Sequence, residues 1–243
     1  MQLEIIYKDE NFVAINKPSG LLVHRSPIDK KEKKFALQMV RNQIGQRVYP
    51  VHRLDRPTSG VLLFALNSET AKKFAHLFQT GQVQKKYIAV VRGYIPEKGT
   101  VDHPVKKIKD QYIRHQIKQK DDSNEKIYPA VTVFKQLAKI KLPFAVDKYP
   151  SSRYSLAELI PKTGRRHQLR RHMKHLSHPI IGDTRYGKDV HNKFFVNQFN
   201  CKGLLLAAVE MHFIHPETGT DVLITAAPNQ TFSLILKQFN WNI

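Results

Sequence analysis

The chain has 243 residues, of which 41% are hydrophobic, enough to bury the core of one domain spanning residues 1–243. Lysine and arginine number 40 against 20 aspartates and glutamates, so the formal net charge of +20 indicates a polyanionic partner, above all nucleic acid. No apolar run approaches the roughly 20 residues that span a bilayer, and the N-terminus lacks a secretory-signal pattern, so we expect a cytoplasmic protein without a membrane partner.

The first third of the chain predicts two strands, a helix, a further strand and a second helix. They are expected, in that order, over residues 3–7, 12–16, 34–44, 61–66 and 68–81. The run from Val61 to Leu66 is apolar throughout, which is typical of a buried central strand. We expect Ser68 to cap the second helix and Gly81 to end it.

The rest of the chain is richer in strands than in helices. Strands are predicted over residues 83–91, 128–137, 154–160, 204–208, 211–214 and 222–225, and a closing helix over 231–239. The polar segment from Lys106 to Lys126 is expected to be a mobile insertion. Many strands joined by short turns predict an α+β protein, with a mixed, mainly antiparallel sheet flanked by helices and loops.

One acidic residue stands among cations in the segment from His52 to Gly60. Asp55 lies between Arg53 and Arg56 in a predicted turn, just before the apolar strand. Two flanking guanidinium groups favour the ionised carboxylate, which would be available as a nucleophile or a base. An ion pair that merely caps the turn is the alternative, because structural ion pairs outnumber catalytic ones.

The densest cationic stretch runs from Lys162 to His172. Thr163 is expected to cap a helix there, and the inward stripe of that helix would be Leu169, Met173 and Leu176. Cations recur every four residues on another face, at Arg166, Arg170 and Lys174. Such a row can follow RNA phosphates, although an ordinary solvated face is the alternative. Arg165 starts the helix, and we expect its guanidinium to pair with the Asp55 carboxylate.

Metal and nucleotide chemistry find little support in the sequence. Four histidines cluster at His167, His172, His175 and His178. However, no carboxylate occurs between Leu159 and Gly182, and the many arginines disfavour a divalent cation. Residues 182–188 match the start of a phosphate-loop pattern, but Asp189 stands where a hydroxyl should hold magnesium. The single cysteine, Cys201, is expected to be a buried, inert thiol. We expect neither a metal nor a nucleotide cofactor.

Four segments, in this order, resemble the RluA family of RNA pseudouridine synthases. They are His-Arg-Leu-Asp-Arg-Pro-Thr-Ser-Gly at 52–60, Lys-Lys-Tyr at 85–87, the cationic stretch at 162–172 and His-Pro-Ile-Ile-Gly-Asp at 178–183. The opening segment at 16–24 fits that family as well. The resemblance covers most of the chain, and Arg-Leu-Asp followed by Ser-Gly is highly specific. It therefore outweighs the turn-capping explanation of Asp55.

The resemblance implies that a target uridine is flipped out of the RNA, freed at N1 and rejoined through C5, without a cofactor. It gives Asp55 the role of the essential aspartate, as a nucleophile at the ribose C1′ or as a base at C2′. Tyr87 would lie against the flipped base, and Arg165 would pair with Asp55. Arg53 would fill the space that the base vacates, and Leu169 would contact the pyrimidine.

Many members of this family carry an N-terminal RNA-binding domain of the S4 type, whereas this chain begins at the catalytic sheet. The resemblance is therefore to a short branch, and it implies tRNA as substrate, with uridine sixty-five as the target, for an enzyme that we expect to be a monomer. The residues expected to bind RNA are Arg53, Arg56, Arg166, Leu169, Arg170 and Lys174. Two alternatives stay open: a synthase that acts on ribosomal RNA, and a non-catalytic RNA-binding protein that uses only its basic surface.

Overall fold

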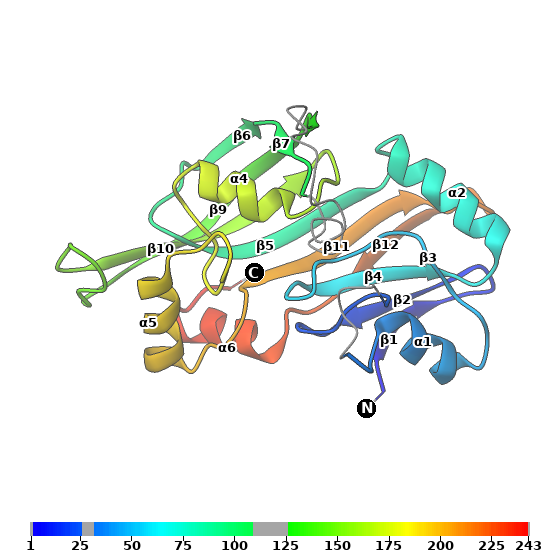
Figure 1. Ribbon diagram of the computed structural model, residues 1–243, viewed down its shortest axis with the longest axis horizontal. Helices are drawn as coiled ribbons and strands as arrows, with labels where there is room; N and C mark the ends of the chain where they lie inside the picture. Colours follow the sequence, from blue (N-terminus) through cyan, green and yellow to red (C-terminus); the bar gives the residue numbers. More distant parts are fainter. Residues whose placement is uncertain (1, 26–31, 109–125, 243) are drawn as a thin grey trace, which may run out of the picture.

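The computed structural model describes residues 2–25, 32–108 and 126–242. The strands are β1 (Glu4–Lys8), β2 (Phe12–Lys17), β3 (Tyr49–Pro50), β4 (Ser59–Ala65), β5 (Gln84–Arg92), β6 (Lys98–Asp102), β7 (Val105–Lys106), β8 (Ile127–Tyr128), β9 (Val131–Leu142), β10 (Ser152–Pro161), β11 (Leu206–Ile214) and β12 (Asp221–Thr225). The helices are α1 (Ala36–Ile44), α2 (Ser68–Gln79), α4 (Gln168–His175), α5 (Asp189–Phe199) and α6 (Gln230–Gln238). Figure 1 shows one long sheet flanked by these helices, so the predicted α+β class is confirmed.

The long sheet joins two antiparallel halves at one parallel junction. Its strand order is β1-β2-β4-β11-β5-β10-β9-β6, with β12 also paired to β11 and β3 to β4. Within the described residues, β4 and β11 are its only parallel neighbours, and they meet at Ser59–Ala207 and Gly60–Ala208. We call these four residues the seam. Gly60 has a φ of +110°, and a Cβ there would lie 2.0 Å from the Ala208 carbonyl oxygen, so only glycine permits this close approach.

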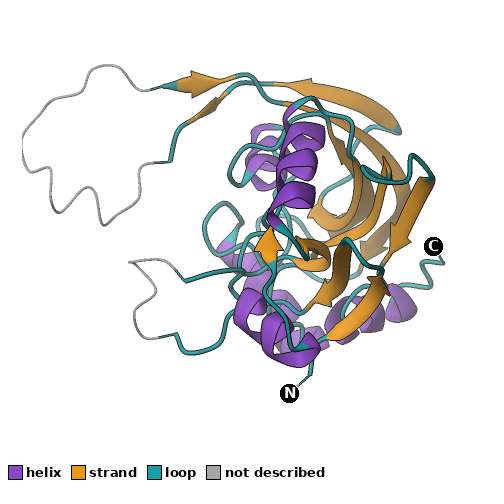
Figure 2. Ribbon diagram, turned by 90° about the vertical axis from the view of Figure 1, so that its right-hand side faces the viewer, coloured by secondary structure: helices purple, strands orange, loops and turns teal. Residues whose placement is uncertain are grey.

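Alternation along the strands gives the sheet two apolar faces. On β5, Ile88 and Val90 belong to a core cluster that also contains side chains of α5 and α6. The intervening Ala89 and Val91 pack on the opposite face with Leu169 and Met173 of α4. Figure 2 shows the strands curving along one side of the molecule, with helices on both sides of them. Alternate residues of the central strand β5 therefore pack against helices on opposite faces of the sheet.

Most predicted elements are present, with ends shifted by a few residues, but several local expectations are wrong. Asn67, not Ser68, caps α2, because the Asn67 side chain accepts the backbone N–H of Thr70 at 2.8 Å. The two strands predicted at 204–208 and 211–214 form the single strand β11. The helix α5 was not predicted, since no side chain caps its start and nothing in the sequence marks it. The short strand β6 was also missed.

Three further expectations concern single features of the chain. Most of the polar segment expected to be an insertion, residues 109–125, lies outside the described residues. Cys201 is buried as expected, and burial raises the pKa of its thiol to about 11. In the part of the chain that the structure describes, no helix has the length and apolar character needed to cross a membrane.

Candidate active site

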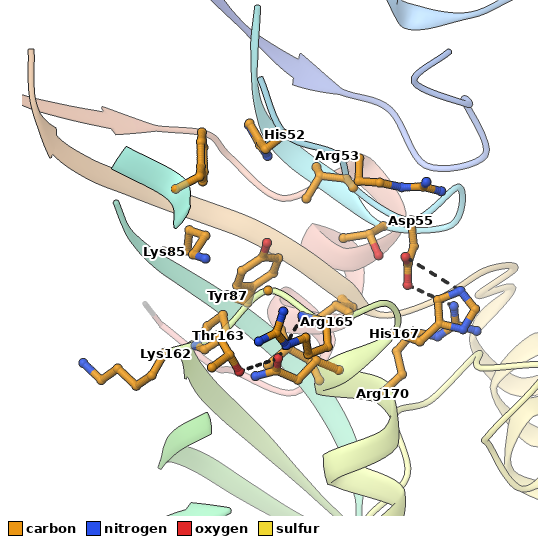
Figure 3. Close-up of a pocket in the computed structure, with 18 of the residues that line it drawn as sticks. His52, Arg53, Asp55, Lys85, Tyr87, Lys162, Thr163, Arg165, His167 and Arg170 are labelled. Carbon is orange, nitrogen blue, oxygen red and sulfur yellow. Dashed lines mark hydrogen bonds and ion pairs between the residues drawn. The ribbon is translucent and has the colours of Figure 1, made fainter. Parts of the chain in front are cut away.

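A cavity of about 650 Å³ brings together the segments that the sequence singled out. Its walls come from the turn before β4, the end of α2, the strand β5 and the segment that leads from β10 into α4. Figure 3 shows Asp55, Tyr87 and Arg170 meeting in this cavity, with Lys85 at one side. Residues far apart in the sequence therefore share one pocket.

Asp55 is held in a short, tied-down turn. The Asp55 carbonyl accepts the backbone N–H of Thr58 at 3.0 Å, just before β4 begins. The ammonium of the fully buried Lys17, at the end of β2, donates to the carbonyls of Leu21 at 2.9 Å and Arg56 at 3.2 Å. Burial lowers the pKa of Lys17 to about 7, while the charge of Asp55 opposes that shift. The turn is thus anchored to the neighbouring strand.

Arg170 is the arginine that pairs with Asp55. Its Nη1 donates to Oδ2 of Asp55 at 3.1 Å. The other two nitrogens of the guanidinium are hydrogen-bonded to Asp183, whose carboxylate accepts from Nε at 2.7 Å and from Nη2 at 2.9 Å. Arg170 is only 5% exposed. It therefore bridges two carboxylates inside the protein, and it does not lie in the exposed row of cations in which the sequence placed it.

The ion pair between Arg170 and Asp183 stays charged despite its burial. Burial alone would raise the pKa of Asp183, but the hydrogen bonds from Arg170 and from the backbone N–H groups of Tyr186 and Arg185 hold it below its ordinary value. Burial would likewise lower the pKa of Arg170, and the hydrogen bond and charge of Asp183 raise it instead. A fixed positive charge is therefore maintained beside Asp55.

Arg165 does not pair with Asp55, which corrects the expectation from the sequence. It is exposed, its Nε donates to the carbonyl of Pro129 at 3.2 Å, and its guanidinium lies 5.4 Å from the centre of the Tyr128 ring. The physical reason is the late start of α4 at Gln168, which leaves Arg165 in the preceding loop. Arg165 still lines the cavity.

The late start of α4 also divides the expected row of cations. Arg166 lies in the turn before the helix and is exposed, and Lys174 is exposed on the helix itself. The predicted cap is wrong as well, because the Thr163 hydroxyl donates to Oε1 of Gln168 at 2.7 Å instead of capping α4. Gln168 was not predicted as a site residue, and it ties this loop to the helix. Arg166 and Lys174 are thus left as surface cations.

Tyr87 and Leu169 form an apolar wall of the cavity. Tyr87 packs against the core clusters on both sides of the seam, and Leu169 is 6% exposed. Burial, followed by the charge of Asp55, raises the pKa of the Tyr87 phenol. In Figure 3 this phenol lies between Asp55 and Lys85. Tyr87 therefore offers a protonated hydroxyl on a mainly apolar surface.

His167 is a site residue that the sequence did not separate from its neighbouring histidines. Its backbone is left-handed, with φ 57°, and its Nε2 lies 3.8 Å from Oδ1 of Asp55. Its Nδ1 is 3.0 Å from the Tyr186 hydroxyl. Burial lowers the pKa of His167 to about 4, with the charge of Asp55 opposing the shift. The imidazole beside Asp55 is therefore neutral near pH 7.

His52, Phe78 and Lys85 close another side of the cavity. The Nε2 of His52 accepts the backbone N–H of Leu63 at 3.0 Å, and its ring stacks on Phe78 with centroids 4.8 Å apart. Burial, followed by the charge of Lys85, lowers the pKa of His52 to about 3. Burial also lowers the pKa of Lys85. This wall thus combines a neutral imidazole with a partly buried amine.

The remaining predicted residues lie at the surface around the turn. Arg53 is exposed and lines the cavity. Arg56 is exposed and donates to Glu32 at 2.6 Å and to the carbonyl of Gly20 at 3.0 Å. Across the described ranges, no group of three or more histidine, cysteine or acidic side chains could hold a metal ion.

The comparisons with known proteins agree on one family. Residues 11–175 match the family model described as RNA pseudouridylate synthase. The chain is 50% identical over 242 residues to tRNA pseudouridine synthase C of Haemophilus ducreyi, covering 100% of this chain and 98% of that protein. It is 48% identical to tRNA pseudouridine synthase C of Vibrio parahaemolyticus, covering 100% and 97%. Among solved structures, human RNA pseudouridylate synthase domain containing 4 superposes with a TM-score of 0.70 at 25% identity, covering 98% of this chain and 93% of that chain.

The chain belongs to the RNA pseudouridylate synthase family, as the four sequence segments predicted. It is therefore an isomerase that acts on RNA. Within that family, and over its whole length, it is similar to the RluA-type enzymes named tRNA pseudouridine synthase C.

Proposed function

We propose that the protein converts one uridine of tRNA to pseudouridine in the cytoplasm, with Asp55 as the reacting carboxylate. The observation that carries this proposal is the meeting of Asp55, Tyr87 and Arg170 in one cavity of a pseudouridine synthase fold. The relatives that match this chain over its full length are named tRNA pseudouridine synthase C, which supports tRNA as the substrate class. The net charge of +20 suits a polyanionic substrate.

The cavity suits a nucleotide that has left the RNA stack. A uridine must be flipped out before its glycosidic bond can be reached, and the pocket then has to hold the base apart from water. Tyr87 and Leu169 supply the apolar surface for the ring. Arg53, at the edge of the cavity, takes the space that the base leaves in the RNA. The exposed Arg166 and Lys174 bind phosphates.

The reaction rearranges bonds within one nucleoside. The N1–C1′ bond breaks and its electron pair leaves with the uracil ring, either as Asp55 attacks C1′ or as Asp55 removes the C2′ proton. After the ring turns, a C5–C1′ bond forms and Asp55 returns to its starting state. The C5 proton is then lost and N1 gains a proton. Because uridine and pseudouridine are isomers, the reaction needs no oxidant or reductant.

Arg170 is the positioning residue for Asp55 in this scheme. Its ion pair favours the carboxylate form and fixes the direction of one oxygen, while Asp183 prevents the guanidinium from turning away. Arg165 takes the role of an RNA contact at the edge of the cavity in place of the pairing first expected for it. The two arginines are therefore assigned different tasks.

Release of tritium from tRNA labelled at uridine C5 tests the proposal, because only formation of the C5–C1′ bond expels that hydrogen. Wild-type protein should release tritium, and mapping should place the product at uridine sixty-five. Asp55→Asn should release none, while it binds tRNA at least as tightly as wild type because one negative charge is lost.

Each contrary result has a definite meaning. Release only from ribosomal RNA would overturn the substrate. Release by Asp55→Asn at the wild-type rate would overturn the role of the carboxylate. Tight binding of both RNAs without release would favour a non-catalytic RNA-binding protein.

A further inference from the structure

Lys85 places a cation in the cavity to which the chemistry above gives no role. It lies on β5 two positions before Tyr87, so both side chains leave the same face of the strand, about 7 Å apart. Across the cavity, a Cβ added to Gly164 would lie 4.0 Å from Lys85 Nζ. Figure 3 shows the amine turned towards Tyr87. Lys85 is therefore a lining residue next to the proposed base site.

The described part of the chain gives Lys85 no carboxylate partner. The adjacent Lys86 leaves the opposite face of β5 and pairs with Glu210 at 2.9 Å. Lys85 instead has its Nζ 6.0 Å from the centre of the Phe78 ring and faces the neutral His52. Burial alone accounts for its lowered pKa, with no acidic side chain opposing it. A partly buried ammonium of this kind gains most from an anion that the ligand supplies.

We propose that Lys85 stabilises the uracil ring at the moment it leaves C1′. The proposal rests on the function proposed above, in which the N1–C1′ electron pair departs with the ring. That negative charge spreads over N1, O2 and O4, so an ammonium at a ring oxygen binds the departing ring more strongly than neutral uridine. Such differential binding accelerates the bond-breaking step.

The order of residues along the cavity favours the base over a phosphate as the partner of Lys85. Asp55 acts on the ribose and Tyr87 lies against the base, and in Figure 3 Lys85 lies beyond Tyr87 as seen from Asp55. This places Lys85 at the edge of the base that is remote from the sugar. Phosphates flank the ribose, on the side of Asp55, where Figure 3 shows the exposed Arg53.

The test compares Lys85→Met with Lys86→Met, which removes the next cation from the opposite face of the same strand. Single-turnover tritium release and the Kd for tRNA are measured for both variants and for wild type. Lys85→Met should release tritium about 10²-fold more slowly, while its Kd changes less than about threefold. Lys86→Met should match wild type in both. Lys85→Arg, which keeps the charge, should recover part of the lost rate.

A modified substrate separates charge stabilisation from damage to the fold. Fluorine at C5 of the target uridine withdraws electrons and stabilises the departing ring by itself. The rearranged ring cannot lose its fluorine as a cation, so it keeps the fluorine and takes up water across N1 and C6. Formation of this product, followed by nuclease digestion and mass spectrometry, should depend on Lys85 about tenfold less than conversion of ordinary RNA. A structural role for Lys85 would reduce both conversions equally.

Four outcomes would overturn the assignment. An equal loss on both substrates would make Lys85 structural, and a loss confined to Kd would make it a phosphate contact. An active wild type with an unaffected Lys85→Met would overturn this assignment alone. An inactive wild type would overturn the proposed function, and this assignment with it.

Discussion

Asp183 holds the Arg170 guanidinium through two hydrogen bonds, of 2.7 and 2.9 Å, and leaves one edge of it facing Asp55. The two residues are thirteen positions apart, and the loop after α4 brings them together. The orientation of the Asp55 carboxylate therefore depends on an acidic residue that does not line the cavity itself.

The first prediction concerns Asp183→Asn. The amide keeps the volume but leaves the partly exposed Asp55 as the only carboxylate that pairs with the buried guanidinium among the described residues, so we expect the free energy of unfolding to fall by about 3 kcal/mol. Turnover should fall at least about tenfold, with little change in KM, because Arg170 is no longer fixed beside Asp55. Urea denaturation and steady-state kinetics measure the two effects.

Asp189→Asn, which removes one partner of an exposed ion pair with Lys193, is the control and should change neither the free energy of unfolding nor the turnover. Wild-type turnover in Asp183→Asn would contradict the bridging role.

The second prediction separates the two arginines. Arg170→Lys keeps the charge but loses the planar fork that joins two carboxylates, so it should lower kcat about 10²-fold. Arg165→Lys should lower kcat less than about threefold, because among the described residues the Arg165 guanidinium stacks on Tyr128 and donates to a backbone carbonyl, with no carboxylate partner. Single-turnover kinetics on one tRNA preparation compare them. Equal losses would show that Asp55 does not depend on Arg170 in particular.

The sequence assigned the pairing with Asp55 to Arg165 and RNA binding to Arg170, whereas in the structure Arg170 pairs with Asp55. The reason for the difference is local. Asp55 could be predicted because its neighbours in the chain surround it with cations and a buried strand follows. The choice between Arg165 and Arg170 depends on where α4 begins, because a start at Gln168 places Arg170 on the helix and leaves Arg165 in the preceding loop. Nothing in the sequence marked Gln168 as the first helical residue.

The structural roles of two acidic residues, Asp183 in the loop after α4 and Asp189 at the start of α5, could not be predicted for a related reason. In the sequence, Asp183 and Asp189 served only as objections to a phosphate loop. Asp183 meets its partner Arg170 only because the loop at residues 182–188 folds back on α4, and the sequence does not show this contact. The long apolar strands β4 and β5, by contrast, were predicted, because their apolar runs need no information from elsewhere in the chain, whereas short strands such as β6 were missed.

The third prediction concerns acid stability. Burial lowers the pKa of His52 to about 3 and the pKa values of His167 and His191 to about 4. Between about pH 6.5 and pH 4 the unfolded chain binds protons that the folded protein does not, so the free energy of unfolding falls as the pH falls. Each histidine contributes a slope of at most about 1.4 kcal/mol per pH unit.

His191→Gln tests this slope away from the cavity, because His191 is buried on α5 beside the Tyr154 hydroxyl. Denaturation curves at several pH values between 4 and 6.5 should show a shallower dependence for the variant than for wild type. Parallel dependences in the two proteins would show that His191 is protonated in the folded protein.

The fourth prediction concerns Gly60→Ala. The new Cβ would meet the Ala208 carbonyl and a backbone φ of +110°, so we expect a loss of about 3 kcal/mol in the free energy of unfolding. Gly45→Ala is the control, because it shares a positive φ but meets nothing within 4 Å, and it should lose about 1 kcal/mol. Similar losses would show that the seam can open to accept a side chain.

The position of β11 also governs when the protein acquires its activity. Asp55 precedes β4 and Tyr87 lies on β5, and the strand between them, residues 206–214, is synthesised long after both. A late segment must therefore enter between two early ones, which is a slow, non-local step of folding. Until then the carboxylate and the phenol belong to separate pieces of sheet. Catalytic competence is thus acquired with the last central strand and not with the residues that do the chemistry.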